Sequence, residues 1–119
     1  MAAGALFGAA AVILGAFGAH ALRGMLAPQQ LGWWQTAVQY QMAHALALLL
    51  IAALGPPRAR LAAALMSVGI LIFSGTLYLM ALGFPHWLGA ITPLGGLLLI
   101  AGWLTLAWSA LTQGGRTAS

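Results

Sequence analysis

This chain of 119 residues is 63% hydrophobic and only 3% charged, so it cannot hydrate the surface of a water-soluble domain, which has about a quarter charged residues. It contains no aspartate, glutamate or cysteine, which excludes carboxylate general acids, carboxylate ion cages, disulfides and thiolate metal sites. The net charge of +4 comes from four scattered arginines, so we expect no nucleic-acid binding. The length fits a single domain, residues 1–119, with four membrane spans of about 20 residues each.

The first predicted helix is the uncharged run of residues 2–22, which is long enough to cross a bilayer about 30 Å thick. A cleaved signal peptide is the alternative, because Ala19, His20 and Ala21 resemble a small-x-small cleavage site. We favour the membrane helix, since the run has no basic start and is longer than a usual signal core.

The second predicted helix, residues 34–54, follows a pair of tryptophans. Trp33 and Trp34 stand beside the apolar run, where paired tryptophans are typical of the lipid head-group level. The Gly-Pro-Pro sequence at residues 55–57 ends the helix, because proline cannot continue a helix and restricts the residue before it.

Two further helices are predicted at residues 60–82 and 93–111. The last of them begins with Thr92 in the N-cap position and Pro93 at the first helical position, where no amide hydrogen bond is lost. We interpret residues 113–119 as a short polar tail.

These elements predict an all-α integral membrane protein, a four-helix bundle whose neighbouring helices run antiparallel. Four spans put both termini and the loop between the second and third helices on one side of the membrane. That side carries Arg58, Arg60 and Arg116, and the opposite side carries only Arg23. The positive-inside rule therefore predicts that both termini are cytoplasmic.

Small residues are expected to hold the helices together, because apolar side chains gain little from meeting each other in lipid and association depends on close contact. Glycines recur along one face of the first and fourth predicted helices: Gly4, Gly8, Gly15, Gly18, Gly95 and Gly102. We predict that they pack helices within one chain. An interface between copies of the chain is the alternative.

Polar residues form ridges on the second and third predicted helices. They are Tyr40, Gln41, His44, Ser74 and Tyr78. At 1.5 Å per residue, His44 and Ser74 both lie roughly 14 to 15 Å below the outer boundary of the membrane. An unpaired buried polar group costs roughly 2 to 7 kcal/mol, so His44 is predicted to face the bundle interior and to bond to Ser74, Tyr78, Tyr40 or a water molecule.

The polar ridges allow two interpretations. In the first, they only join two helices, and each bond contributes about 0.6 kcal/mol. In the second, the same five residues line a small polar pocket that opens outward, since ionisable residues inside a membrane often mark a site. We expect no metal, haem or other cofactor, because a metal needs three or four ligands and His44 lies too deep to join His20 and His86.

Four blocks of the sequence stand out together: LGAFGAH at 14–20, WWQTAVQYQMAHALALL at 33–49, FSGTLYLMALG at 73–83, and LGAITPLGG with a later GW at 88–96 and 102–103. They resemble the signature of the domain of unknown function 423 family, which includes bacterial YgdD-like proteins and eukaryotic transmembrane protein 256. The resemblance implies a four-helix membrane protein, in the inner membrane if the source is bacterial. It implies no substrate and no catalytic residues. Relatives often carry a charge near the position of Gln39, so an ion pair there is not expected in this chain.

We therefore expect a non-enzymatic bundle that binds or stabilises a membrane component, which is lipid, another membrane protein or a second copy of the chain. The alternative is a small transporter, channel or ligand-binding protein that uses a polar pocket around His44. An enzyme is the third hypothesis, because histidine and tyrosine can move protons but no pair of nucleophile and base stands apart from helix packing.

Overall fold

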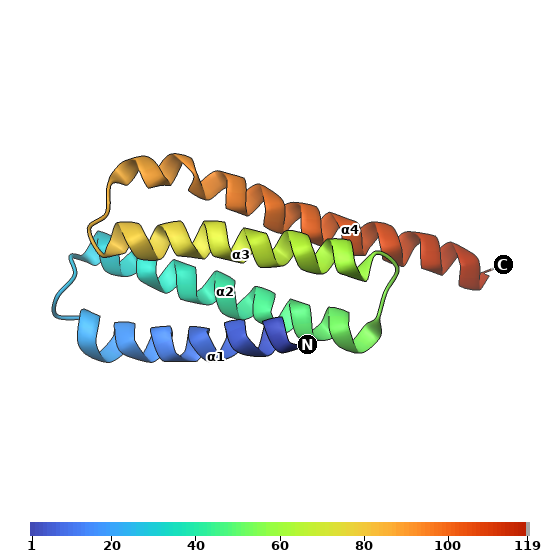
Figure 1. Ribbon diagram of the computed structural model, residues 1–119, viewed down its shortest axis with the longest axis horizontal. Coiled ribbons are helices and arrows are strands. Elements are labelled where there is room, and N and C mark those ends of the chain that lie inside the picture. The colour runs from blue at the N-terminus through green and yellow to red at the C-terminus, as the bar shows by residue number, and fades with distance from the viewer. Residues whose placement is uncertain (119) are drawn as a thin grey trace.

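The computed structural model describes residues 1–118, with side chains for residues 1–112, so the side chain of Arg116 lies outside the described residues. Four long helices form the fold, and each is long and apolar enough to span a membrane. They are α1 (Ala2–Phe17), α2 (Pro28–Leu54), α3 (Ala59–Ala81) and α4 (Thr92–Ala118). The predicted all-α membrane fold with antiparallel neighbours is confirmed (Figure 1).

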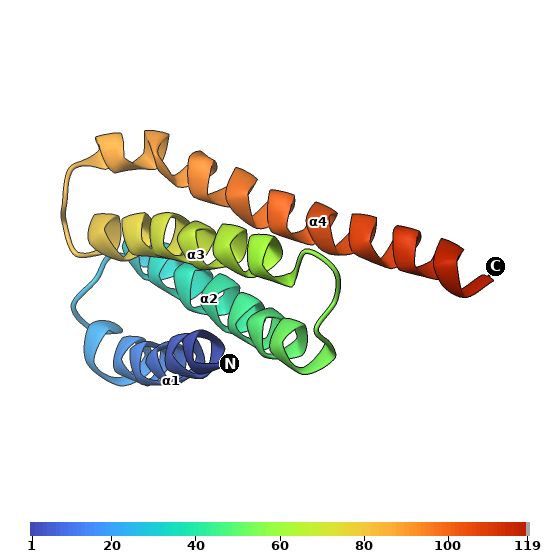
Figure 2. The ribbon, with the colours of Figure 1, turned by 45° about the vertical axis from the view of Figure 1, so that its right-hand side comes forward.

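The helices are arranged in chain order. α1 packs against α2, α2 against α3, and α3 against α4, so α2 and α3 form the centre and α1 and α4 the two flanks (Figures 1 and 2). Both termini lie at the end of the bundle that also holds the loop between α2 and α3. The placement of this end in the cytoplasm stays a prediction.

The first predicted span is helical throughout, since a short π-helix at Gly18–Leu22 continues α1. A second short element, a 3-10 helix at His86–Ala90, precedes α4. α4 itself continues to Ala118 and does not end near residue 111, so the prediction of a tail from residue 113 was wrong. No proline follows to stop the helix, and adding residues to an existing helix costs much less than starting one.

The start of α2 also differs from the prediction. The helix begins at Pro28, because proline suits the first helical position and the side-chain oxygen of Gln30 accepts a hydrogen bond from the Ala27 amide at 3.2 Å. Trp34 therefore lies within the helix and is buried, and its indole N–H donates to the Leu14 carbonyl oxygen at 2.8 Å. This tryptophan joins α2 to α1 and does not anchor the chain at the lipid head groups.

The turn between α2 and α3 begins at Gly55, where the second helix was predicted to end. Gly55 ends α2 with a left-handed backbone conformation (φ +56°), which a glycine adopts without strain. Arg58 also has positive φ, and its guanidinium carbon lies 3.4 Å from the centre of the Trp108 ring on α4. The hydroxyl of Ser109 donates to the carbonyl oxygen of Pro57. The loop is therefore attached to α4 at two points.

The glycines singled out in the sequence lie at different helix contacts. A Cβ on Gly95 would lie 2.4 Å from the backbone nitrogen of Phe73 on α3, and one on Gly102 would lie 2.6 Å from the side chain of Met66. On α1 and the π-helix that continues it, a Cβ added to Gly4, Gly15 or Gly18 would lie 3.0, 3.2 or 2.6 Å, respectively, from the nearest atom of α2. Gly8 is packed less closely, because a Cβ added to it would lie 3.8 Å from the nearest atom, the Cβ of Ala45.

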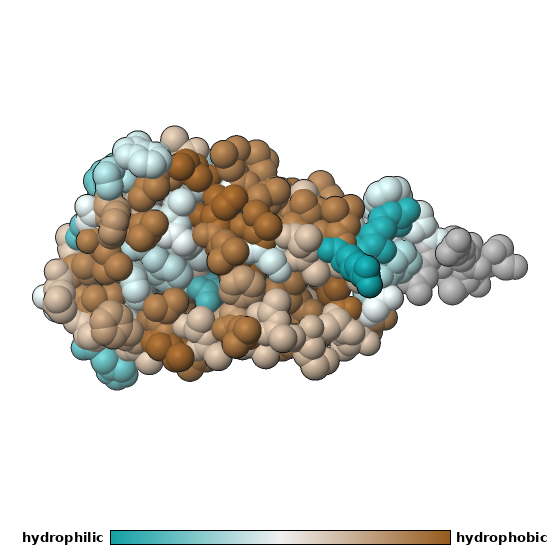
Figure 3. All heavy atoms as spheres, viewed as in Figure 1, coloured by the Kyte–Doolittle hydropathy of each residue, from teal (hydrophilic) through white to brown (hydrophobic). Residues whose placement is uncertain are grey.

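The outer surface of the bundle is largely apolar. Hydrophobic residues cover most of the face shown in Figure 3, and the most hydrophilic residues lie mainly toward its two ends. Large exposed side chains on the flanking helices include Leu6 and Ile13 on α1 and Leu97 and Leu104 on α4. A bilayer solvates such a surface without cost, whereas water would not.

Candidate functional site

The polar residues inside the bundle are centred on Gln41 of α2. Its side chain is only 4% exposed and reaches both neighbouring helices. The amide nitrogen donates to the Phe7 carbonyl oxygen of α1 at 2.8 Å, and the amide oxygen accepts from the Tyr78 hydroxyl of α3 at 2.7 Å. One side chain thus links three helices through its donor and its acceptor.

His44 lies one turn further along α2 and is 7% exposed. Its Nδ1 atom is 2.7 Å from the carbonyl oxygen of Tyr40, and its Nε2 atom is 2.9 Å from the indole nitrogen of Trp103 on α4. A carbonyl oxygen only accepts and an indole N–H only donates, so the proton is assigned to Nδ1 and Nε2 accepts. These partners suit a neutral imidazole.

Of the expected partners of His44, only Tyr40 bonds to it, through its backbone oxygen. Ser74 of α3 is 1% exposed, and its hydroxyl donates to the Ala37 carbonyl oxygen at 2.8 Å rather than to the imidazole. Tyr40 supplies its backbone oxygen, and its exposed ring stacks on His44. Trp103 was missed, because a tryptophan on an oily helix resembles a residue that faces lipid.

The buried polar side chains that the structure describes all have partners. No buried side-chain nitrogen or oxygen lacks a hydrogen bond among residues 1–112, whose side chains are described. Within the same part of the chain, no cluster of three or more histidine, cysteine or acidic side chains could hold a metal ion. The polar groups around Gln41 and His44 therefore direct their hydrogen bonds at other parts of the chain.

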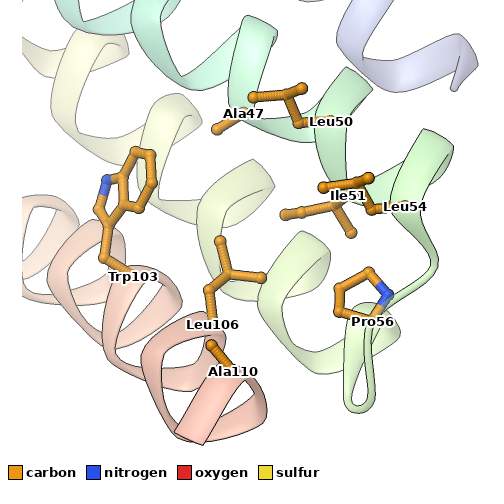
Figure 4. Close-up of a pocket in the computed structure, with 8 residues that line it drawn as sticks. All are labelled: Ala47, Leu50, Ile51, Leu54, Pro56, Trp103, Leu106 and Ala110. Carbon is orange, nitrogen blue, oxygen red and sulfur yellow. The ribbon is translucent and has the colours of Figure 1, made fainter. Parts of the chain in front are cut away.

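A cavity of about 400 Å³ lies beside this network, between α2 and α4 (Figure 4). Figure 4 shows side chains of both helices directed into this space. The lining consists of Ala47, Leu50, Ile51, Leu54, Pro56, Trp103, Leu106 and Ala110. All of these residues are apolar except for the indole nitrogen of Trp103, which is bonded to His44.

The cavity is not the predicted polar pocket, and the two are connected only through Trp103, which lines the cavity and bonds to His44. Tyr40, Gln41, His44, Ser74 and Tyr78 are not among the residues that line the cavity. Sequence reasoning missed the cavity because its lining is ordinary for a membrane helix. The available signal was the two alanines, Ala47 and Ala110, which leave space where larger side chains would fill the gap between α2 and α4.

Comparison with known proteins identifies the family to which this chain is related. Residues 14–96 match the model of a family described as protein of unknown function, DUF423. The chain belongs to the DUF423 family. It is 46% identical to a UPF0382 membrane protein of Staphylococcus haemolyticus over 87% of each chain. It is 43% identical to the UPF0382 membrane protein YwdK of Bacillus subtilis, over 91% of this chain and 92% of YwdK.

A further relative is the UPF0382 inner membrane protein YgdD of Escherichia coli, which is 36% identical over 84% of this chain and 79% of its own. No solved structure matches this DUF423 protein significantly. The predicted family and the predicted location in a membrane, the inner membrane in a bacterium, are confirmed by these relatives and by the four apolar helices.

We expect His44 and Trp103 to stabilise this DUF423 protein as a pair. His44→Leu or Trp103→Phe alone removes the bond between α2 and α4 and leaves one partner unpaired, so each should lower the free energy of unfolding by about 1 kcal/mol. The double variant should lose much less free energy of unfolding than the two single variants lose in sum. Unfolding in mixed micelles, followed by circular dichroism, measures these values, with Trp87→Phe on an exposed ring as the control. Fully additive losses would contradict the pairing.

Proposed function

We propose that this protein is a non-enzymatic membrane protein that binds lipid, and that the cavity between α2 and α4 holds one acyl chain. The observation that carries the proposal is the apolar lining of this cavity of about 400 Å³, which lies between two helices of a membrane-spanning bundle. An acyl chain has no polar group that needs a partner. Such a lining therefore suits it better than it suits a hydrated solute.

The hydrogen bonds of the neighbouring network favour binding over transport or catalysis. A transported polar solute needs donors and acceptors that can bond to it in turn, and a histidine that acts as general acid or base must present one ring nitrogen to a substrate, a nucleophile or a water molecule. Both ring nitrogens of His44 are bonded within the chain, and the amide of Gln41 bonds to α1 and α3. These residues are better suited to holding the helices in position.

His44 has a specific part in this proposal, which is to hold Trp103. The indole is 48% exposed and forms one end of the cavity, and its N–H donates to the imidazole. From Trp103 to Ala110 the cavity extends about 10 Å along α4 at 1.5 Å per residue. An acyl chain would enter near Pro56 and Ala110 and end against the indole ring.

A matched pair of variants on α4 tests the proposal. Ala110 is exposed and lines the cavity, so Ala110→Phe should fill the cavity without disturbing the core. Ala107 is also exposed but is not part of the lining, so Ala107→Phe is the control. Native mass spectrometry of the full chain, released from mild detergent, should detect one fewer phospholipid on Ala110→Phe than on the control. Equal lipid retention by the two variants would refute the proposed site.

A further inference from the structure

A second cavity, of about 280 Å³, lies on the other side of the central helices, between α1 and α3. We call it the α1/α3 groove. Its floor is α2, with Leu48, Ile51 and Ala52, and its walls include Gly4 of α1 and Arg60 and Ser67 of α3. The groove therefore joins an apolar interior to one basic side chain.

Arg60 has no acidic side chain to pair with anywhere in the chain, because the sequence contains no aspartate or glutamate. It is exposed and lies in the first turn of α3, which begins at Ala59. Arg58 is only two residues away, but its guanidinium stacks on Trp108 of α4, and α4 contributes nothing to the groove. Arg60 is therefore the arginine that lines this groove.

We propose that the α1/α3 groove binds an anionic phospholipid, with the lipid phosphate on Arg60 and one acyl chain along α2 toward Ser67. Arginine presents a fork of N–H donors that matches the geometry of a phosphate group. Ser67 lies seven residues further along α3 than Arg60, about 10 Å deeper at 1.5 Å per residue. Arg60 lies at the end of the groove near the membrane surface, and the apolar lining lies deeper. A phospholipid has the same order, with its phosphate at the surface and its acyl chains below.

The charge in the groove favours a lipid over an apolar partner helix. A lipid phosphate can pair with Arg60, whereas an apolar helix has no group that does so. This site also goes beyond the proposed function, because the α2/α4 cavity is lined by no charged residue and has no reason to select a head group.

Competition between two lipids tests the inference. The full chain in mild detergent is mixed with equal amounts of phosphatidylglycerol and phosphatidylcholine that carry the same acyl chains, and native mass spectrometry measures the ratio of the two bound lipids. One arginine near the membrane surface contributes about 1 kcal/mol toward an anionic lipid, which is about a fivefold preference for phosphatidylglycerol at the groove. With one further lipid held without preference in the α2/α4 cavity, we expect about a twofold excess of phosphatidylglycerol among the bound lipids. Arg60→Gln should reduce the ratio to about one. Arg58→Gln removes the same charge from the same end and should leave the ratio unchanged.

Two alanines of α2 supply a second, independent comparison. Ala52 is exposed and lines the groove, so Ala52→Phe should reduce phosphatidylglycerol binding, whereas Ala53→Phe, also on an exposed residue but outside the lining, should not. Neither residue is part of the core, so both variants should fold. Wild-type binding without a preference, an equal loss with Arg58→Gln and Arg60→Gln, or unchanged binding by Ala52→Phe would each overturn the inference.

The outcomes for the two lipid sites are distinguishable. If Ala110→Phe retains as much lipid as its control while Arg60→Gln abolishes the preference for phosphatidylglycerol, the proposal for the α2/α4 cavity fails and this inference stands. If Ala110→Phe loses one lipid and Arg60→Gln changes nothing, the reverse holds.

Discussion

Replacing Gly95 by alanine is expected to lower the free energy of unfolding by about 2 kcal/mol, because the added methyl group has no space between α3 and α4. Its Cβ would lie 2.4 Å from the backbone nitrogen of Phe73 and 2.8 Å from the Cα atom of the same residue. Backbone atoms cannot rotate away as a side chain can. The two helices must therefore move apart and lose contact along their interface.

Gly75 of α3 provides the matched control for this prediction. No atom lies within 4 Å of a Cβ added to Gly75, and alanine is a better helix former than glycine by about 1 kcal/mol. Gly75→Ala should therefore leave stability unchanged or raise it. Gly102→Ala should be milder than Gly95→Ala, because the methyl group meets the flexible side chain of Met66.

Unfolding of these glycine variants in mixed micelles, followed by circular dichroism, gives the three free energies. If Gly95→Ala proved as stable as Gly75→Ala, the close approach of α4 to Phe73 would be refuted.

Replacing Gln41 by leucine is the second change with a large expected effect, a loss of about 1.5 kcal/mol. Leucine is of similar size but removes the hydrogen bonds to Phe7 of α1 and to Tyr78 of α3 at the same time. The Tyr78 hydroxyl then loses its acceptor in a medium that offers no water as a replacement. The loss should exceed that of His44→Leu, because Gln41 joins three helices and the His44–Trp103 bond joins two.

A double-mutant cycle with Tyr78→Phe measures the pair directly. Tyr78→Phe alone leaves the amide oxygen of Gln41 unpaired, whereas the double variant removes both ends of the bond. The double variant should therefore be destabilised by less than the sum of the two single changes. Gln35→Leu, on an exposed residue of the same helix, controls for the change from amide to alkyl. A coupling energy of zero would show that the bond adds nothing to stability.

The start of α2 shows how far prediction from the sequence extended. The apolar run from Trp34 onward was evident, but the helix begins at Pro28 and includes a glutamine-rich turn before that run. The hydropathy pattern marks the part of a helix that lies in lipid, and it does not mark a turn that continues into the head-group region. The helix start depends instead on the capping bond between Ala27 and Gln30.

The candidate site was predictable only in part. Helical periodicity and depth placed Gln41, His44 and Tyr78 on ridges of neighbouring helices, and the bond between Gln41 and Tyr78 joins two of these residues. The same reasoning named Ser74, Tyr78, Tyr40 or a water molecule as partners of His44 and did not consider the fourth helix. Trp103 lies on α4, 59 residues away in the chain.

The sequence by itself determined the solvent of this protein and the number of its spans. Four apolar stretches without a single acidic residue are stable only in lipid, and each must form a helix there to satisfy its own backbone hydrogen bonds. The tertiary structure alone decided which side chains meet across helices, and so placed His44 against Trp103 and left the α2/α4 cavity and the α1/α3 groove open. Periodicity assigns a residue to a face of its own helix, whereas the neighbour of that face depends on how closely glycines such as Gly95 let the helices approach.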